Sequence, residues 1–334
     1  MTFQELHSRP FLPLATERLL MRPISQEDAP EIARLLNNLN VSKTLARVPY
    51  PYSLQDAHHF ISLKIQEMKE GQPVVVLTIL DRTNHQFMGL ISIENGTIGY
   101  WLGEPCWGKG FMKEAAKAFV HFLFDMCGIP EFEISAIPSN LGSVRIIEGL
   151  GCTPTEQKKV FTPALQETQL SQYYKLTQED YWARYEALTV PILWVSAAAL
   201  LKDGQLLVAE RPQGKSMAGV WELPGGKIEE GETPERPLAR ELHEELGITV
   251  DPHNLKPLTF ASYRYEKFHL VMPFFTLTQW EGELHSKENQ RLAWIHYQDL
   301  IHYPTPAADI ALFHKLYDVM QREGLWTAAA ESEN

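Results

Sequence analysis

Three glutamates in the second half of the chain have a spacing that suits metal chemistry. Glu241, Glu244 and Glu245 stand at positions i, i+3 and i+4, so a helix would place all three on one face. Two carboxylates about 4 Å apart repel each other by roughly 1 to 4 kcal/mol, depending on how wet the site is. A hard divalent cation would offset that repulsion, because it prefers oxygen ligands. The plainer alternative is a charged helix face that water solvates.

The residues around these glutamates delimit a short helix. Thr233 is a suitable N-cap, Pro234 suits the first turn, and Gly247 suits the C-terminal end. Ahead of the helix, residues 223–226 (LPGG) predict a tight loop whose bare backbone can approach a ligand. We therefore expect a helix with its carboxylates in the second half and a ligand-binding loop before it.

Residues 226–248, GKIEEGETPERPLARELHEELGI, resemble the Nudix hydrolase signature at every fixed position. Nudix enzymes hydrolyse a nucleoside diphosphate linked to another group, by attack of water at phosphorus. The resemblance implies that Mg²⁺ or Mn²⁺ is the cofactor, that Arg240 and Glu232 orient the helix carboxylates, and that Glu241 is the first candidate for the base. The metal ligands that it implies are Gly225 (through its carbonyl), Glu241, Glu244, Glu245 and Glu288.

Similarity to the MutT-like 8-oxo-dGTP diphosphatases extends over residues 210–248. It implies that Glu288 is a distal metal ligand or base and that Asp309 reads the purine edge. Their alternative roles are a loop charge and a helix-start residue. The residues placed against the substrate are Arg211, Glu222, Leu223, Pro224, Gly225 and Asp309. Coenzyme A pyrophosphatases are Nudix enzymes too, but we do not find their additional pattern ahead of residues 224–226.

A second phosphate-binding pattern lies in the first half of the chain. Residues 107–110 (WGKG) lead directly into an apolar helix that Gly128 ends. A strand, a glycine turn and a helix N-terminus form an anion site, because free amide N–H groups and the helix dipole converge there. By itself such a pattern is weak evidence for an anion site, so the order of the surrounding elements decides whether we predict one.

Three stretches in that order, residues 15–23, 99–115 and 140–152, together resemble the GNAT N-acetyltransferases of the RimJ/RimL-like branch. The resemblance covers nearly all of residues 14–180. It implies that loop amides cradle the pyrophosphate of acetyl-CoA, that Asn140 contacts this cofactor, and that Ser143 is a possible proton donor to the leaving thiolate. The cradle positions are Gly108, Lys109, Gly110, Phe111 and Met112. Asn140 is equally suited to cap the helix that follows it.

This chain departs from the GNAT pattern at Trp107, where Gln or Arg is common, and at Met112, where a small residue is common and Met would crowd the loop. Amide donors do not depend on the side chain, so we expect the cradle to be kept. No general base can be assigned: Glu94 and Glu104 flank the expected catalytic strand and Tyr100 lies between them, but each suits a surface or core position better than the role of base.

Length and composition bound the remaining possibilities. A chain of 334 residues suits two domains, and three unpatterned cysteines indicate a reduced compartment. The net charge of −12 argues against non-specific binding to nucleic acid or anionic membranes. We see no signal peptide and no apolar run long enough to span a membrane, and we expect a cytoplasmic location.

We therefore expect a two-domain α/β (α+β) protein. The predicted parts are a GNAT domain (1–188), a linker (189–191), a Nudix α/β/α sandwich (192–326) and a disordered tail (327–334). The predicted function is an acetyl-CoA-dependent acetyltransferase with an unknown amine acceptor, joined to a nucleoside triphosphate pyrophosphohydrolase that sanitises the nucleotide pool and so supports DNA repair. Alternatives are a first half that only senses acyl-CoA and a second half that acts on another nucleotide or on coenzyme A.

Overall fold

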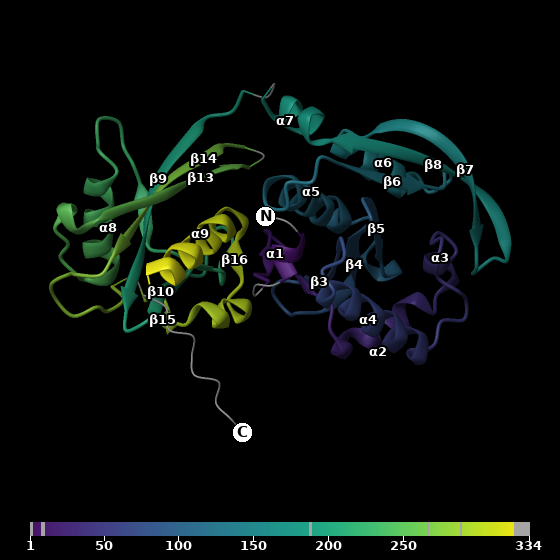
Figure 1. The fold of residues 1–334 in the computed structure, drawn as a ribbon, viewed down its shortest axis with the longest axis horizontal. Coiled ribbons are helices and arrows are strands. Elements are labelled where there is room, and N and C mark those ends of the chain that lie inside the picture. The colour runs from purple at the N-terminus through teal and green to yellow at the C-terminus, as the bar shows by residue number, and fades with distance from the viewer. Residues whose placement is uncertain (1–2, 8–10, 187–188, 266, 288, 324–334) are drawn as a thin grey trace. The chain divides into compact units, whose positions relative to one another are not determined.

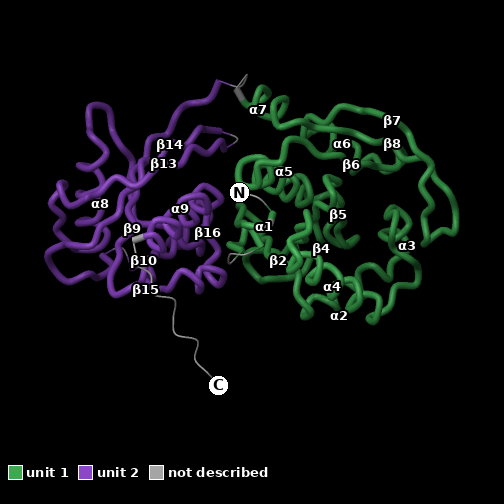
Figure 2. Tube along the Cα trace, viewed as in Figure 1, with its two compact units in different colours: residues 1–188 green, residues 189–334 purple. Residues whose placement is uncertain are grey.

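The computed structural model describes residues 3–7, 11–186, 189–265, 267–287 and 289–323. The chain divides into two compact units, unit 1 (residues 1–188) and unit 2 (residues 189–334), as Figures 1 and 2 show. Each unit has its own sheet and its own buried core, so each is described by itself. The predicted tail and Glu288 lie outside the described residues.

Unit 1 is built on a sheet with the strand order β1-β2-β3-β4-β5-β6-β8-β7. Its strands are β1 (Leu14–Ala15), β2 (Leu19–Pro23), β3 (Val74–Asp81), β4 (Phe87–Glu94), β5 (Thr97–Leu102), β6 (Glu131–Ala136), β7 (Thr153–Thr162) and β8 (Glu167–Thr177). All neighbours are antiparallel except β5 and β6. That parallel pair is joined at Thr97–Glu133 and Ile98–Ile134, and β5 then runs on to Leu102 without β6 as a partner. The sheet therefore opens between these two strands.

Helices pack on this sheet because each carries an apolar face. They are α1 (Phe3–His7), α2 (Ala29–Leu36), α3 (Leu39–Ser42), α4 (Leu54–Lys69), α5 (Phe111–Asp125), α6 (Leu141–Leu150) and α7 (Gln178–Glu186), with 3-10 turns η1 (Gln26–Asp28) and η2 (Glu104–Cys106). Ser53 is a typical N-cap residue, and in the structure it starts α4 by forming a reciprocal capping box with Asp56. The α5 helix buries Phe119, Phe122 and Phe124 in the core.

One helix of unit 1 differs from the prediction. The sequence indicates a continuous helix from Ser25 to Asn37, but the structure divides it into η1 and α2 at Asp28. The Asp28 carboxylate accepts hydrogen bonds from the Ser25 amide at 2.9 Å, from the Arg22 guanidinium at 2.7 and 2.9 Å, and from the Thr78 hydroxyl at 2.8 Å. These contacts to β2 and β3 fix the start of α2 at this carboxylate.

Unit 2 contains a sheet with the order β11-β10-β9-β14-β13, to which β12 adds beside β9 and β15 beside β10. Its strands are β9 (Ile192–Lys202), β10 (Gln205–Glu210), β11 (Trp221–Glu222), β12 (Gly225–Lys227), β13 (Lys256–Arg264), β14 (His269–Leu277), β15 (Leu292–Ile295) and β16 (Thr305–Pro306). The helices are α8 (Glu235–Leu246) and α9 (Ala307–Glu323), with 3-10 turns η3 (Pro252–Asn254) and η4 (Tyr297–His302).

The α8 helix buries Leu238, Leu242 and Leu246 against Ala198 and Leu200 of β9. The alternate residues of β9 point to the other face of the sheet and are buried as well. Figure 1 shows α8 and α9 on the two sides of this sheet. Unit 2 is thus a layered α/β/α arrangement, as predicted.

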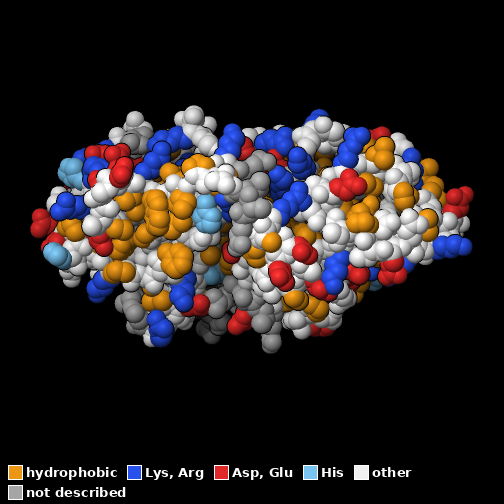
Figure 3. All heavy atoms as spheres, turned by 90° about the horizontal axis from the view of Figure 1, so that it is seen from above, with side chains coloured by type: hydrophobic (Ala, Val, Ile, Leu, Met, Phe, Trp, Pro, Cys, Tyr) orange, Lys and Arg blue, Asp and Glu red, His pale blue; other side chains and the backbone are white. Residues whose placement is uncertain are grey.

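The β9 strand extends beyond the part that the helices cover. Ile192 and Trp194 on β9 and Phe260 on β13 are exposed at 57, 47 and 66 %. Figure 3 shows hydrophobic side chains gathered on one surface of unit 2, with charged side chains interspersed elsewhere. No helix among the described residues is long and apolar enough to cross a membrane.

The ends of α8 test the predicted boundaries. The C-terminal end is confirmed, because Gly247 caps the helix with a positive φ of 73°. The N-terminal prediction is wrong by one residue: the helix begins at Glu235, and Pro234, rather than Thr233, is at the N-cap. The Thr233 backbone still takes part, because its carbonyl accepts a hydrogen bond from the Arg236 amide at 3.2 Å.

The Asp28 contacts predict a large effect of substitution. Replacing Asp28 by Ala leaves the donors of Arg22 and Thr78 without their acceptor inside the core, so we expect a loss of about 3 to 5 kcal/mol in the free energy of unfolding. The matched control is Glu31→Ala, which removes an exposed ion pair to Arg34 and should cost less than about 1 kcal/mol. Urea unfolding of both variants measures the difference, and equal stabilities would contradict this account.

Candidate functional sites

Unit 1 contains a cavity of about 820 Å³ where β5 and β6 separate. Residues 100–102 of β5 line it together with Ile137 and Ser139 after β6, the α6 N-cap Asn140, and residues 141–143 in the first turn of α6. The predicted cradle opens into the same cavity through Gly108, Gly110, Phe111 and Met112. The structure therefore brings together the glycine turn, Asn140 and Ser143, which are distant in sequence.

The glycine turn has the backbone conformation that the cradle needs. Gly108 and Gly110 have positive φ angles of 72° and 79°, which other residues seldom adopt, and Gly110 is the N-cap of α5. The first amides of α5 lack partners inside the helix, and the helix dipole makes this end attractive to anions. An acetyl-CoA pyrophosphate fits such an end by charge and by hydrogen-bond donors.

Arg18, in the turn immediately before β2, fixes the glycine turn. Its guanidinium donates to the Lys109 carbonyl at 2.9 Å, pairs with the Glu114 carboxylate at 2.7 Å, and lies 4.7 Å from the Phe111 ring centroid. Thr16 also donates to Glu114, at 2.6 Å. The loop and the first turn of α5 are thereby tied to the sheet.

The two departures from the GNAT pattern have specific places in the structure. The Trp107 indole N–H donates to the Leu102 carbonyl at 2.7 Å and so closes the loop onto β5. The Met112 side chain is buried and lines the inner end of the cavity. Neither side chain replaces a backbone amide of the turn.

Asn140 caps α6, because its side-chain oxygen accepts from the Ser143 amide at 3.2 Å. Asn140 also lines the cavity, so the capping role and a cofactor contact are compatible. The Tyr100 hydroxyl donates to the Ser143 carbonyl at 3.4 Å. Burial raises the pKa of Tyr100 to about 12, so this hydroxyl is protonated at neutral pH.

The two carboxylates considered as general bases have other partners. Glu94 accepts from Lys64 and from Arg47, each at 2.7 Å. Burial acts to raise the pKa of Glu94, but these two cations outweigh it and lower the pKa overall. Glu104 accepts from the amides of Asn38 and Asn40 at 2.6 and 3.0 Å. Neither carboxylate is among the residues that line the cavity.

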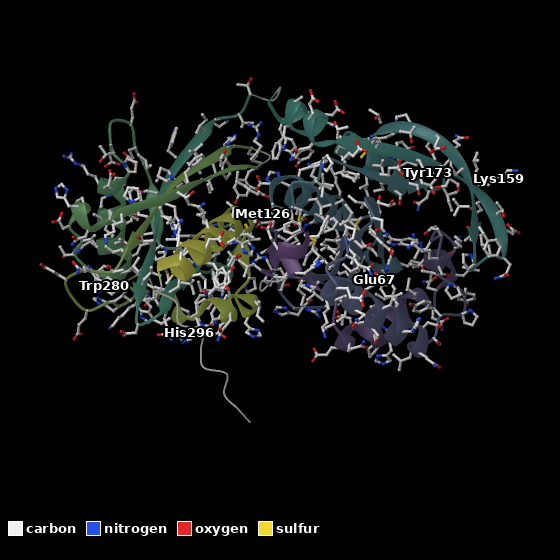
Figure 4. The ribbon with its side chains drawn as sticks, in the orientation of Figure 1. Glu67, Met126, Lys159, Tyr173, Trp280 and His296 are labelled. Carbon is white, nitrogen blue, oxygen red and sulfur yellow. The ribbon has the colours of Figure 1, made fainter. Side chains whose placement is uncertain are left out.

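The sequence did not identify the remaining wall of the cavity. Asn40, Val41, Lys43 and Thr44 contribute from α3 and the turn after it. Leu165 and Gln169 contribute from the β7–β8 hairpin, on which Figure 4 labels Lys159 and Tyr173. Sequence patterns do not reveal these residues, because a four-residue helix and a hairpin end have no motif that reports what they face.

In unit 2 the loop and the signature helix meet as predicted. Gly226 lies so close to Glu241 that a Cβ on this glycine would overlap the glutamate side chain. The Gly225 carbonyl and the α8 carboxylates therefore belong to one region. Arg240 pairs with Glu232 at 2.8 Å and lies 3.8 Å from Glu241. The Glu229 amide, and after it Arg240, lower the pKa of Glu232.

The donors of this region fit a hard divalent cation by chemistry, since all are carboxylate or carbonyl oxygens. Among the residues that the structure describes, no three His, Cys, Asp or Glu side chains come together as a ready metal-binding group. The carboxylates of Glu241, Glu244 and Glu245 instead follow one another along α8. Glu288, the expected distal ligand, lies outside the described residues.

The segment before Glu288 is tied to the C-terminal end of α8. The Lys287 ammonium donates to the His243 carbonyl at 3.0 Å, and the Lys287 amide donates to the Glu245 carbonyl at 2.8 Å. The His285 amide donates to the Leu246 carbonyl at 3.0 Å. Carbonyls that a helix end leaves without partners are thus satisfied, and a cation lies at the negative end of the dipole.

A second group of predicted residues meets at the other side of the LPGG loop. Arg211 pairs with Glu222 at 2.9 Å and donates to the Ser216 carbonyl at 3.1 Å. Asp309 at the start of α9 is 6 % exposed and accepts a backbone hydrogen bond from Leu223. Burial first, and then the charge of Glu222, raise the pKa of Asp309 to about 7. The pKa of Glu222 is also raised by burial.

Tyr265 joins this group, although the sequence gave no reason to select it. Burial and the charge of Asp309 raise the pKa of Tyr265, and its hydroxyl contacts the Ala308 backbone. Its ring lies 4.7 Å from that of Phe268 and 4.8 Å from that of Tyr263, centroid to centroid. A cluster of three tilted aromatic rings therefore includes Tyr265, whose hydroxyl lies near the Asp309 carboxyl.

Comparisons with known proteins identify the family of each unit. A family model described as an acetyltransferase (GNAT) domain matches residues 18–153, and one described as a NUDIX domain matches residues 196–315. The chain therefore belongs to the Nudix family through its second unit and carries a GNAT acetyltransferase domain in its first. The predicted fusion and the predicted fold class are confirmed.

Three relatives indicate the range of proteins that resemble the two units. The chain is 41 % identical over 87 residues to an 8-oxo-dGTP diphosphatase of Proteus vulgaris, which is 26 % of this chain and 76 % of that protein. It is 37 % identical over 120 residues to a CTP pyrophosphohydrolase of Escherichia coli K12, which is 35 % of this chain and 86 % of that protein. It is 29 % identical over 143 residues to an uncharacterized N-acetyltransferase p20 of Bacillus licheniformis, which is 41 % of this chain and 80 % of that protein.

The cradle can be tested through its backbone conformation. We expect Gly110→Val to weaken acetyl-CoA binding about tenfold or more, because valine disfavours the positive φ and would turn the amides away from the anion. Gly96→Val is the matched control, since Gly96 has a φ of 77° in the β4–β5 turn and open space around it. Calorimetric titration with acetyl-CoA measures both, and pyrophosphate release by unit 2 should be unchanged in both. Equal binding losses would contradict the cradle assignment.

Proposed function

We propose that the protein is bifunctional. Unit 1 transfers the acetyl group of acetyl-CoA to an amine, and unit 2 hydrolyses a nucleoside triphosphate with release of pyrophosphate, using Mg²⁺ or Mn²⁺. The observation that carries the proposal for unit 2 is the packing of Glu241 onto Gly226, together with the Arg211–Glu222 ion pair and the buried Asp309 at the start of α9. The proposal for unit 1 rests on the cavity that joins the glycine turn to Asn140 and Ser143.

In unit 2 the proposed metal ligands are Glu241, Glu244, Glu245, the Gly225 carbonyl and Glu288. A metal ion held there neutralises phosphate charge and makes water more acidic. Glu241 accepts the proton of the attacking water, whose oxygen forms a bond to phosphorus as the bond to the leaving phosphate oxygen breaks. Arg240 and Glu232 hold the carboxylates in orientation through their ion pair.

In unit 1 the acceptor nitrogen forms a bond to the thioester carbon, and the carbon–sulfur bond breaks. The hydroxyl of Ser143 or of Tyr100 supplies a proton to the departing thiolate, and the nitrogen loses its surplus proton to solvent. Ser143 is the first choice of donor, because burial raises the pKa of Tyr100 to about 12 and so makes that hydroxyl a weaker acid. The cradle amides hold the cofactor by its pyrophosphate.

A nucleotide of the 8-oxo-dGTP type is our first choice of substrate for unit 2, with CTP as the second. Both occur in the names of relatives that this unit resembles. Removal of an oxidised nucleotide would keep it out of DNA, which would place the activity in nucleotide pool sanitation. In this proposal the Asp309 carboxyl discriminates between the two bases.

A second candidate for unit 1 is a sensor that binds acyl-CoA without transferring the acyl group. It is favoured by the engagement of Glu94 with Lys64 and Arg47 and of Glu104 with two asparagines. Release of free thiol from acetyl-CoA across a panel of amines distinguishes an enzyme from a sensor. Pyrophosphate release measured with and without acetyl-CoA shows whether such a sensor controls unit 2.

The metal assignment predicts a loss of hydrolysis on a neutral substitution. Glu245→Gln keeps the size of the side chain but removes a charge, so we expect pyrophosphate release to fall at least about a hundredfold, with the fold intact by circular dichroism. Glu235→Gln removes a charge from the first turn of the same helix, outside the proposed ligands, and should retain activity. Turnover at the wild-type rate in the Glu245 variant would refute the assignment.

The raised pKa of Asp309 predicts a change of base preference near pH 7. The ionised carboxylate accepts two N–H groups, as on the N1 and N2 edge of guanine, whereas the neutral acid offers one donor and one acceptor, as cytosine requires. We therefore expect the ratio of kcat/KM for 8-oxo-dGTP over CTP to rise as the pH increases through about 7.

Asp309→Asn has one donor and one acceptor at every pH, so its ratio should be low and independent of pH. The raised pKa of Asp309 in the wild type also affects stability. Because the folded-state pKa of Asp309 is above its unfolded value, this carboxyl favours the folded state below about pH 4. That contribution to the free energy of unfolding is lost as the pH rises through 7. A pH-dependent ratio in the Asn variant equal to that of the wild type would contradict the role of Asp309.

A further inference from the structure

The cavity of unit 1 has two chemically different parts. One part contains the glycine turn and the N-terminal end of α5, where the proposed cofactor phosphates lie. The other part is formed by Asn40, Lys43 and Thr44 near α3 and by Leu165 and Gln169 of the β7–β8 hairpin. These side chains are not needed by the cradle, so they are available to bind the acceptor.

The charges in this cavity have one sign. Lys43 and Lys113 are the charged side chains among the described residues that line it, and none of those residues is an aspartate or a glutamate. Lys113 lies in the first turn of α5, close to the cradle. Lys43 follows α3 and belongs to the other group of lining residues, which we assign to the acceptor.

A network of amides holds Lys43 without neutralising it. The Lys43 ammonium donates to the Asn40 side-chain oxygen at 3.0 Å. The Asn40 side-chain nitrogen donates to Glu104 at 3.0 Å, and Asn38 donates to the second oxygen of the same carboxylate at 2.6 Å. Asn40 therefore stands between the lysine and Glu104, and the ammonium keeps its charge and two further donor hydrogens for a ligand.

We propose that the acceptor of unit 1 is a small primary amine that also carries an anionic group, a carboxylate or a phosphate, and that Lys43 binds this group. Thr44 and Gln169 supply neutral hydrogen-bonding groups beside it. The inference deepens the proposed acetyltransferase function and rests on it. Polycationic amines are disfavoured for two reasons. The described lining contains no carboxylate to attract them, and its two lysines repel them.

The same surroundings account for the lack of an assignable base. An ammonium group that enters a partly apolar cavity without a carboxylate loses hydration and gains no counter-charge, so its pKa falls. The amine then sheds its proton to solvent before it attacks, and a carboxylate is not required at the reacting atoms. Glu94 and Glu104 can accordingly remain in their ion-pair and amide contacts.

The test compares matched acceptors on the full chain at saturating acetyl-CoA, with thiol release as the signal. The pairs are alanine with alaninamide, and phosphoethanolamine with ethanolamine; spermidine and a short peptide test cationic and polypeptide acceptors. We expect at least one anionic member to exceed its neutral partner about tenfold or more in kcat/KM. The pair that shows this preference identifies the anion as carboxylate or phosphate.

Lys43→Met should abolish that preference by raising KM about tenfold or more for the anionic acceptor, with kcat and acetyl-CoA binding little changed, and Lys43→Arg should restore most of it. Lys159→Met makes the same charge change on the exposed face of β7, outside the lining residues, and should behave as wild type. Preference for a neutral, cationic or peptide acceptor, or a preference that survives Lys43→Met, would overturn the proposal.

Calorimetric titration of the acetyl-CoA complex with alanine and with phosphoethanolamine separates this inference from the underlying function. Binding that Lys43→Met removes, without thiol release from any amine, would support the anion site while refuting acetyl transfer. If no anionic amine shows either binding or turnover, the anion site itself is refuted.

Discussion

The repulsion between the carboxylates of α8 is the constraint on which unit 2 depends. Glu241, Glu244 and Glu245 cannot be moved apart, because the helix fixes their spacing. The opposite face of α8 stabilises the helix by burying Leu238, Leu242 and Leu246 against the sheet. The Arg240–Glu232 pair and the Lys287 contacts at the helix end add favourable charge interactions around this acidic face. In the proposed reaction a bound cation offsets the remaining repulsion between the carboxylates, and the sheet, loop and helix hold its ligands.

Unit 1 solves the problem of binding phosphate in a different way. In the proposed function it uses backbone amides at the N-terminal end of α5 and two glycines with positive φ, which Arg18 and Glu114 hold in place. Each unit of this acidic chain therefore supplies local positive potential to an anionic substrate. One does so through a helix N-terminus and lysines, and the other through metal ligands.

The carboxylates of unit 1 show how packing decides chemistry. Glu94 and Glu104 are near β5 in sequence and have the right group to act as bases. Arg47, Lys64 and the asparagines of the α3 region contact them from segments 30 to 66 residues away. What remains at the cavity is a lysine, amides and hydroxyls. This composition selects the acceptor by its charge instead of deprotonating it with a carboxylate.

The sequence alone determined the features that depend on short-range geometry. These features follow from residues within a few positions of one another. They are the carboxylate spacing of α8, the capping box at Ser53, the glycine end at Gly247 and the glycine turn before α5. The family of each unit could be inferred from local motifs of this kind. Tertiary structure decided the rest. It divided the helix after Ser25 because Asp28 bonds to Thr78, 50 residues away. It also turned Lys43 into the cavity and buried Asp309 beside Glu222. Such outcomes depend on desolvation and on partners from distant segments, which no local pattern records.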